Sequence, residues 1–168
     1  MKKTALLFCF LLVHFMLLAQ DDKASRPSPP AQATAIVNGK TLTIDYSQPS
    51  VKGRKIWGEL VPYGQVWRAG ADETTAFTLS ADAVVEGKNL SAGKYAFFVI
   101  PDEKEAVIIF NKTIKWGAFS YKQEEDVLRV SVPVRKSKSF VEKLTYNISA
   151  RGDVSLTWEN SVIEFTVK

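Results

Sequence analysis

Two apolar runs decide the fold: YAFFVI at residues 95–100 and AVIIF at residues 106–110, separated by the short stretch PDEKE. Both runs carry apolar side chains at neighbouring positions, so both faces of each segment must be covered by other parts of the protein. The Pro101-Asp102 pair between them is a turn signal. We therefore expect two central β-strands with a turn between them.

The segments around this pair alternate between apolar and polar residues. In a half-buried strand, neighbouring side chains point to opposite faces. Leu42, Ile44 and Tyr46 would then face the core, and the intervening polar residues, such as Thr41 and Asp45, would face solvent. The same period of two recurs over residues 128–135, 144–148, 154–158 and 163–167, and no stretch shows a helical stripe. The pattern predicts an all-β protein, a single antiparallel β-sandwich of about eight or nine strands, with a partly open β-barrel as the alternative.

The N-terminus has the features of a secretory signal peptide. Lys2 and Lys3 precede an almost unbroken apolar stretch, residues 5–18, which is followed by Ala19 and Gln20. The stretch is shorter than the roughly 20 apolar residues that span a bilayer, so we expect cleavage and no stable membrane span afterwards. Residues 1–19 are therefore interpreted as a signal peptide, and the protein as exported, either periplasmic or extracellular. We expect a flexible Pro-rich linker over residues 20–34 and one β-sandwich domain over residues 35–168.

The rare residues restrict the chemistry of the mature domain. Cys9, His14 and both methionines lie within the predicted signal peptide. A domain without Cys or His cannot form a Ser-His-Asp triad, a thiol nucleophile or a usual zinc or copper site. We therefore predict no metal and no cofactor, and leave only carboxylate chemistry open.

The charge of the chain does not favour a nucleic-acid partner. Removing Lys2 and Lys3 takes the basic residues from 22 to 20 against 18 acidic ones, so the net charge falls from +4 to +2. A domain that neutralises phosphates needs a basic stripe. Here Lys and Arg are interspersed with Asp and Glu along the whole chain.

One long segment, residues 47–75, does not alternate and contains most of the candidate site residues. In the functional interpretation, flat rings and directed polar groups in this loop bind a ligand such as a sugar; they are Arg54, Trp57, Tyr63, Trp67, Arg68, Asp72 and Glu73. In the structural interpretation, which we favour, Trp67 plugs one end of the sandwich and Arg68 pairs with Glu73 or Asp126.

A second aromatic loop carries Trp116 and Tyr121 ahead of Asp126. Capping of the core is again the simpler interpretation. If both aromatic loops lie at the same end of the sandwich, they form one cleft with Arg68 and Asp126 on its rim.

Three stretches resemble one known family. They are VPYGQVWRAGADETT at residues 61–75, VEGKNLSAGKYAFFVIP at 85–101 and WGAFSYKQEEDVLRVSV at 116–132. They resemble the exported proteins catalogued as domain of unknown function 2911, from about residue 41 to 168, in which Asn is more common at the position of Asp72. The resemblance implies an exported, β-rich protein and supplies no reaction.

Three functions are compatible with these patterns. The leading hypothesis is a non-enzymatic module that binds a ligand, such as a glycan, or a cell-envelope partner through the 54–73 loop. A carboxylate-dependent glycan hydrolase is the alternative; it would use two of Glu59, Asp72, Glu73 and Asp126 at a separation of roughly 5 to 9.5 Å. A purely structural envelope protein is the third. No catalytic residue is assigned, and no oligomeric state is predicted.

Overall fold

A computed structural model describes residues 23–168, so the predicted signal peptide and the first residues of the predicted linker lie outside the described part. Within that part there is no α-helix, and no helix with the length and apolarity to cross a membrane. The elements are η1 (Lys23–Ser25), β1 (Pro30–Val37), β2 (Lys40–Ser47), β3 (Ala76–Leu79), β4 (Ala83–Val85), β5 (Lys88–Leu90), β6 (Gly93–Pro101), β7 (Glu105–Asn111), η2 (Ala118–Ser120), η3 (Gln123–Glu125), β8 (Asp126–Ile148) and β9 (Asp153–Thr166).

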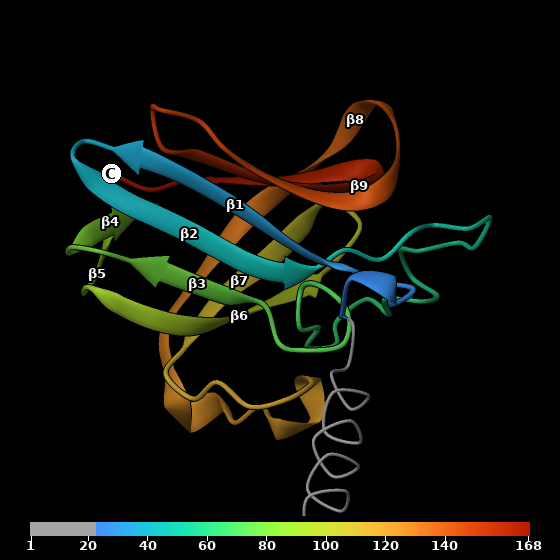
Figure 1. Cartoon of the computed structure of the whole chain (residues 1–168), viewed down its shortest axis with the longest axis horizontal. Helices are drawn as coiled ribbons and strands as arrows, with labels where there is room; N and C mark the ends of the chain where they lie inside the picture. Colours follow the sequence, from blue (N-terminus) through green and yellow to red (C-terminus); the bar gives the residue numbers. More distant parts are fainter. Residues whose placement is uncertain (1–22) are drawn as a thin grey trace, which may run out of the picture.

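Seven of the strands form one antiparallel sheet in the order β1-β2-β3-β6-β7-β8-β9, and β4 and β5 form a separate hairpin. The large sheet curls into a half-barrel (Figure 1). The all-β antiparallel fold class is confirmed, and the curled sheet corresponds to the partly open barrel. The runs at residues 95–100 and 106–110 are β6 and β7, which pair with each other in the middle of the sheet.

Backbone hydrogen bonds attach two further segments to the large sheet. After β2, the chain meets the C-terminal part of β8: the Val51 amide donates to the Glu142 carbonyl at 2.8 Å, and the Leu144 amide to the Pro49 carbonyl at 2.9 Å. On the other side, Val84 of β4 exchanges backbone hydrogen bonds with Lys168. These contacts attach the loop after β2 and the β4-β5 hairpin to the sheet.

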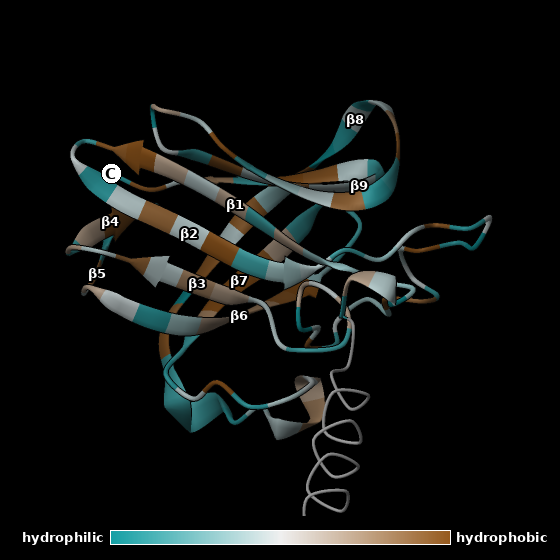
Figure 2. Cartoon of the chain, viewed as in Figure 1, coloured by the Kyte–Doolittle hydropathy of each residue, from teal (hydrophilic) through white to brown (hydrophobic). Residues whose placement is uncertain are grey.

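The concave face of the sheet contains the main core. Leu42 and Ile44 are fully buried on β2, and the strand alternates in hydropathy along its length (Figure 2). Phe77, Phe97 and Phe110 pack on one another at the centre, with ring centroids 5.2 to 5.9 Å apart. The described residues contain no cysteine, so no disulfide among them holds the fold together. Burial of apolar side chains such as these, each contributing about 1.5–3 kcal/mol, stabilises it instead.

The convex face of β6 and β7 carries a second, smaller core. Ala96, Phe98 and Ile109 are buried there beneath Tyr121 and other side chains of the connecting loops. Both faces of these strands are therefore covered, as their apolar composition predicts.

The predicted linker is wrong for residues 30–34, which form the start of β1. The pairing begins with Pro30 opposite Ser47 and continues without a break to Val37. The cause is an alternation that the proline-rich composition conceals: Ala31, Ala33 and Ala35 pack inward against the core. Pro30 is tolerated because it is the first residue of the strand.

Candidate functional site

Three tryptophans, Trp57, Trp67 and Trp158, pack together at the inner end of the long 47–75 segment. Trp67 stacks on Trp158 with ring centroids 6.0 Å apart, and Trp57 meets the ring of Trp67 edge-on at 5.8 Å. Trp57 is only 8% exposed, and its indole N–H donates to the Trp158 carbonyl at 3.3 Å. The rings of Trp57 and Trp67, which the ligand hypothesis assigned to binding, are therefore engaged in packing.

Trp67 points inward because residues 64–67 return to the sheet as a short extension beside β6. The Trp67 amide donates to the Val99 carbonyl at 2.8 Å, and the Val99 amide donates back at 2.9 Å. Neighbouring side chains of an extended segment point to opposite faces, so Val66 joins the convex core while Trp67 enters the concave one. This placement favours the interpretation of Trp67 as a plug.

Arg54 and Tyr63 do not form a ligand site with these rings. Arg54 donates from Nε and Nη2 to the carbonyls of Val51 and Ser50 at 3.0 and 2.6 Å, which closes its own turn. Tyr63 is 37% exposed, and partial burial raises the pKa of its hydroxyl. The hollow between Tyr63 and Trp57 has a volume of only about 20 Å³, room for a single water molecule.

The predicted ion pairs of Arg68 are wrong. Glu73 pairs with Lys23 and Arg26, and Asp126 pairs with Arg129. The Nε atom of Arg68 is buried and has no hydrogen-bond partner among residues 23–168. Both expected partners are already held by cations closer to them.

Asp72 occupies a turn position at which the backbone conformation restricts the residue type. Its φ angle is +50°, in the left-handed region. Asn and Asp adopt this conformation more readily than other residues with side chains. A preference for Asn or Asp at this position therefore has a conformational explanation that does not need a side-chain amide donor.

Glu73 lies in a cluster of cations contributed by the N-terminal segment. Arg26 Nη1 donates to both carboxylate oxygens at 2.9 and 3.1 Å, and Lys23 Nζ lies 3.0 Å from Oε1. Hydrogen bonds from Lys23, from the backbone N–H of Glu73 and from Arg26 lower the pKa of this carboxyl to about 2. Glu73 is therefore ionised at neutral pH and is a poor general acid.

A cleft of about 580 Å³ opens beside Glu73 on the outer side of the sheet. The N-terminal segment, β1, β2 and the loop after β7 contribute to its walls, and charged residues of both signs lie on its rim. Asp45 accepts a hydrogen bond from Gln32 at 2.6 Å and lies 3.9 Å from Lys94. The lining comprises Lys23, Arg26, Pro30, Ala31, Gln32, Asp45, Tyr46, Ser47, Glu73, Thr74, Ala76, Lys94 and Ile114.

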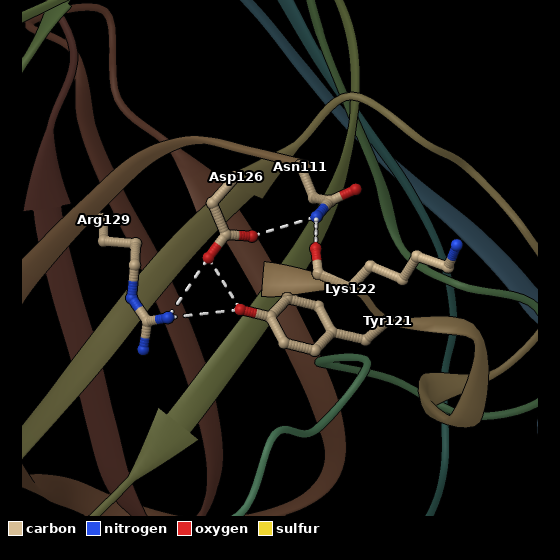
Figure 3. A network of polar contacts seen from close by, with 5 residues as sticks. All are labelled: Asn111, Tyr121, Lys122, Asp126 and Arg129. Atoms are coloured by element: carbon tan, nitrogen blue, oxygen red, sulfur yellow. Dashed lines mark hydrogen bonds and ion pairs between the residues drawn. The ribbon is translucent and has the colours of Figure 1, made fainter. Parts of the chain in front are cut away.

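Asp126 is the centre of a second polar network (Figure 3). Its Oδ1 accepts from Asn111 Nδ2 at 2.9 Å, and its Oδ2 accepts from the Tyr121 hydroxyl at 2.6 Å and from Arg129 Nη1 at 3.2 Å. Burial and the hydrogen bond to Asp126 raise the pKa of Tyr121 to about 12. Asn111 also donates to the Lys122 carbonyl at 2.9 Å, so the network fastens the loop over residues 112–125 to the ends of β7 and β8.

Trp116 lies in this loop, on the opposite side of the sheet from the core that holds Trp67. It is 58% exposed, and Phe119, whose ring centroid is 5.6 Å away, is 80% exposed. Beneath them, Tyr121 packs on Phe98 of the convex core at 5.1 Å. The rings of Trp67 and Trp116 therefore do not share a cleft, although Glu73 and Thr74 of the first loop and Ile114 of the second line the same one.

The carboxylates considered for glycan hydrolysis are dispersed. Glu59 is exposed and pairs with Lys55 at 3.2 Å. Asp126 has both oxygens occupied by donors, and of the four candidates only Glu73 lines the 580 Å³ cleft. The four candidates therefore supply no pair of carboxylates around one cleft. Asp45, which was not among them, also lines the cleft, where it accepts a hydrogen bond from Gln32 and lies 3.9 Å from Lys94.

Several residues of these clusters were missed by reasoning from the sequence. Lys23 and Arg26 lie in the stretch expected to be linker, and Arg129 was expected only as an outward-facing strand residue. The sequence did contain a signal for the exposure of the two rings. Phe119 lies close to Trp116 in a stretch without the alternating pattern that would bury one face of a strand.

Together, the fold and the two polar clusters define an all-β half-barrel protein with an open outer cleft beside Glu73 and an exposed aromatic loop. The chain belongs to the family described as "Protein of unknown function (DUF2911)", whose family model matches residues 28–167. This confirms the resemblance seen in the sequence. Comparisons with curated proteins and with solved structures gave no match.

Proposed function

We propose that the protein is an exported, non-enzymatic binding module, and that its ligand or cell-envelope partner occupies the cleft beside Glu73. The observation that carries this proposal is the cleft itself. Its volume of about 580 Å³ lies within the range of roughly 300–1,000 Å³ that is usual for ligand sites. The signal-like N-terminus supports export to the periplasm or the cell exterior.

The chemistry of the lining favours a polar ligand such as a glycan. Gln32 provides an amide, and Asp45 and Lys94 add an acceptor and a donor, whereas the hydroxyls of Ser47 and Thr74 are buried and already donate to Glu73 and to the Lys115 carbonyl. A molecule with many hydroxyl groups can exchange hydrogen bonds with such a surface. The tryptophan rings expected to bind a ligand in the 54–73 loop are packed inside, so Glu73 is the residue of that loop that takes part.

The state of the candidate carboxylates supports binding without catalysis. Glu73 in the cleft is held ionised by two cations, and Asp126, outside the cleft, has both oxygens occupied by hydrogen-bond donors. General acid catalysis needs a carboxyl group whose pKa lies near the working pH.

The test compares two neighbouring residue pairs on the outer face of β1 and β2. Gln32 lies opposite Asp45 and lines the cleft, whereas Thr34 lies opposite Thr43 one step along the same face and is not among the lining residues. We would screen a glycan and peptide panel by calorimetry, first with the unchanged protein. We then compare a Gln32→Ala/Asp45→Ala double variant with a Thr34→Ala/Thr43→Ala double variant.

A panel member that binds should lose roughly tenfold or more in affinity in the cleft variant, since two hydrogen-bonding groups of the site are removed, and little in the control variant. A panel with no binder, or a binder indifferent to the cleft variant, would contradict the proposal. Release of reducing sugar from any glycan in the panel would show that the protein is an enzyme.

A further inference from the structure

We propose that the loop over residues 112–122 docks the protein on an anionic lipid bilayer, with Trp116 and Phe119 in the interfacial layer. This inference does not rest on the function proposed for the cleft. It concerns a surface on which apolar side chains and unpaired lysines occur together.

The first observation is the exposure of large apolar side chains in a short segment. Phe119 is 80% exposed, Trp116 58% and Ile114 42%. The rings of Trp116 and Phe119 form one pair, with centroids 5.6 Å apart. Contiguous exposed apolar surface of this kind marks a site of interaction.

The second observation is that the fold holds these rings outward. The Thr74 hydroxyl donates to the Lys115 carbonyl at 2.6 Å, and the Ser120 hydroxyl donates to the Gly117 carbonyl at 2.9 Å. Tyr121 already covers the convex core beneath, where it packs on Phe98. Trp116 and Phe119 therefore cannot take that place without displacing the partly buried side chain of Tyr121.

Gly117 makes the outward turn possible. Its φ angle is +75°, and a Cβ atom at this position would lie 2.6 Å from the ring of Phe119. A residue with a side chain would have to push the ring away and adopt a strained backbone. The pairing of the two rings thus depends on a glycine between them.

The third observation is the charge around the rings. Lys112, Lys115 and Lys122 are exposed, and no acidic residue lies between 112 and 122. Among residues 23–168, none of the three lysines has an ion pair, whereas Glu73 and Asp126 are paired. The nearest acids in the sequence, Glu124 and Glu125, follow in η3.

Exposed aromatic rings among unpaired lysines match the chemistry of a membrane interface. Trp is enriched at the headgroup level of bilayers, and lysines near the surface are attracted to anionic headgroups. In Figure 1 the part of the loop with η2 and η3 projects from one end of the described domain. A projecting loop can insert into a deformable lipid surface without the close shape match that a groove on a protein partner would require.

Quenching of Trp116 fluorescence by brominated lipid tests the insertion directly. The full chain contains four tryptophans, none of them before Trp57, so a leader that itself enters the bilayer adds no signal. The probes are vesicles of brominated phosphatidylcholine alone, and the same lipid mixed with phosphatidylglycerol. We expect quenching with the anionic vesicles, little with the neutral ones, and loss of the quenched component in Trp116→Phe.

Two charge-matched variants then test the lysines. Lys112→Gln/Lys115→Gln/Lys122→Gln should lower partitioning to the anionic vesicles by about tenfold or more. The control is Lys136→Gln/Lys138→Gln/Lys143→Gln, which removes three exposed lysines near the exposed Phe140 of β8 and should change partitioning less than about twofold. Thermal unfolding is measured for every variant, so that only folded proteins are compared.

Three results would overturn the proposal. One is an absence of quenching of Trp116 on anionic vesicles, and another is an equal loss of partitioning in both lysine variants. The third is protection of Trp116 from acrylamide by an envelope protein but not by vesicles, which would assign the loop to a protein partner.

Discussion

The indole of Trp67 lies nearly parallel to that of Trp158, with ring centroids 6.0 Å apart and an angle of 16° between the planes. Trp67 comes from the long segment between β2 and β3, and Trp158 from the last strand of the chain. The stack therefore joins segments that lie far apart in the sequence, at the end of the barrel. It also separates the tryptophans into a packed group of three, of which Trp57 and Trp158 are buried and Trp67 partly buried, and one exposed member, Trp116.

Substitution of Trp67 by Ala should destabilise the protein strongly. The variant loses the stack on Trp158 and leaves a cavity at the end of the core, so we expect a decrease of roughly 3 kcal/mol in the free energy of unfolding. Trp116→Ala, at an exposed position, is the control and should stay within about 0.5 kcal/mol of the unchanged protein. Urea denaturation followed by circular dichroism measures both. Similar losses in the two variants would contradict the division into buried and exposed rings.

Breaking the Asp126 network should loosen the loop over residues 112–125. Asp126→Ala leaves Asn111, which is 1% exposed, without one of its acceptors, and we expect a loss of roughly 1–3 kcal/mol. Tyr121→Phe removes the hydrogen bond donated to Asp126 and the one accepted from Arg129, and should cost about 1–3 kcal/mol. Hydrogen exchange of the loop amides should rise in both variants and stay unchanged in Tyr63→Phe. Unaltered exchange in Asp126→Ala would show that the network does not fasten the loop.

The cluster around Glu73 predicts a dependence of stability on acid pH. The pKa of Glu73 is about 2 in the folded protein against an ordinary value of 4.5, so between these values the unfolded chain binds a proton that the folded protein does not. The stabilisation is complete above about pH 4.5 and is lost as the pH falls towards 2. Because the Glu73 side chain is 41% exposed, salt should weaken the effect.

Comparison with Glu73→Gln isolates this contribution. The difference in melting temperature between the two proteins should be largest near neutral pH and should shrink below pH 4.5. A difference that stays constant down to the acid limit would mean that the charge of Glu73 contributes nothing.

Gly152→Ala should destabilise the turn between β8 and β9. Gly152 has a φ angle of +88°, and an added Cβ atom would collide with the Val167 carbonyl oxygen. The Val167 amide also donates to the Gly152 carbonyl at 2.8 Å, so the chain end cannot move away without losing that bond. We expect a loss of more than about 1 kcal/mol. Gly39→Ala, at a similar φ but with open space around it, is the control for conformational strain alone.

The strand pattern could be predicted because a period of two directly reflects which face is buried. Leu42, Ile44 and Tyr46 are all buried, while Thr41 is exposed, as their alternation indicates. The start of β1 was missed because Ala31 and Ala33 are small and stand in a proline-rich context. Small residues suffice there since β1 lies at the edge of the sheet.

The location of the aromatic loops could not be predicted, because it depends on the side of the sheet to which each loop returns. Val66 and Trp67 would exchange faces if the short extension beside β6 shifted by one residue. No feature of the 47–75 segment encodes that register without the position of Val99. For the same reason the sequence indicated partners for Glu73 and Asp126 but not which cations reach them.

The two ends of the described chain lie at opposite ends of β2. Ser47, where β2 ends, donates to Glu73 in the cluster with Lys23 and Arg26, and Lys40, where β2 begins, donates to the Lys168 carbonyl at 3.3 Å. Eight residues of strand separate these points by about 25 Å. A sensor chip or fluorophore attached through the C-terminus therefore leaves the cleft unobstructed, whereas a purification tag placed directly before Lys23 sits on its rim.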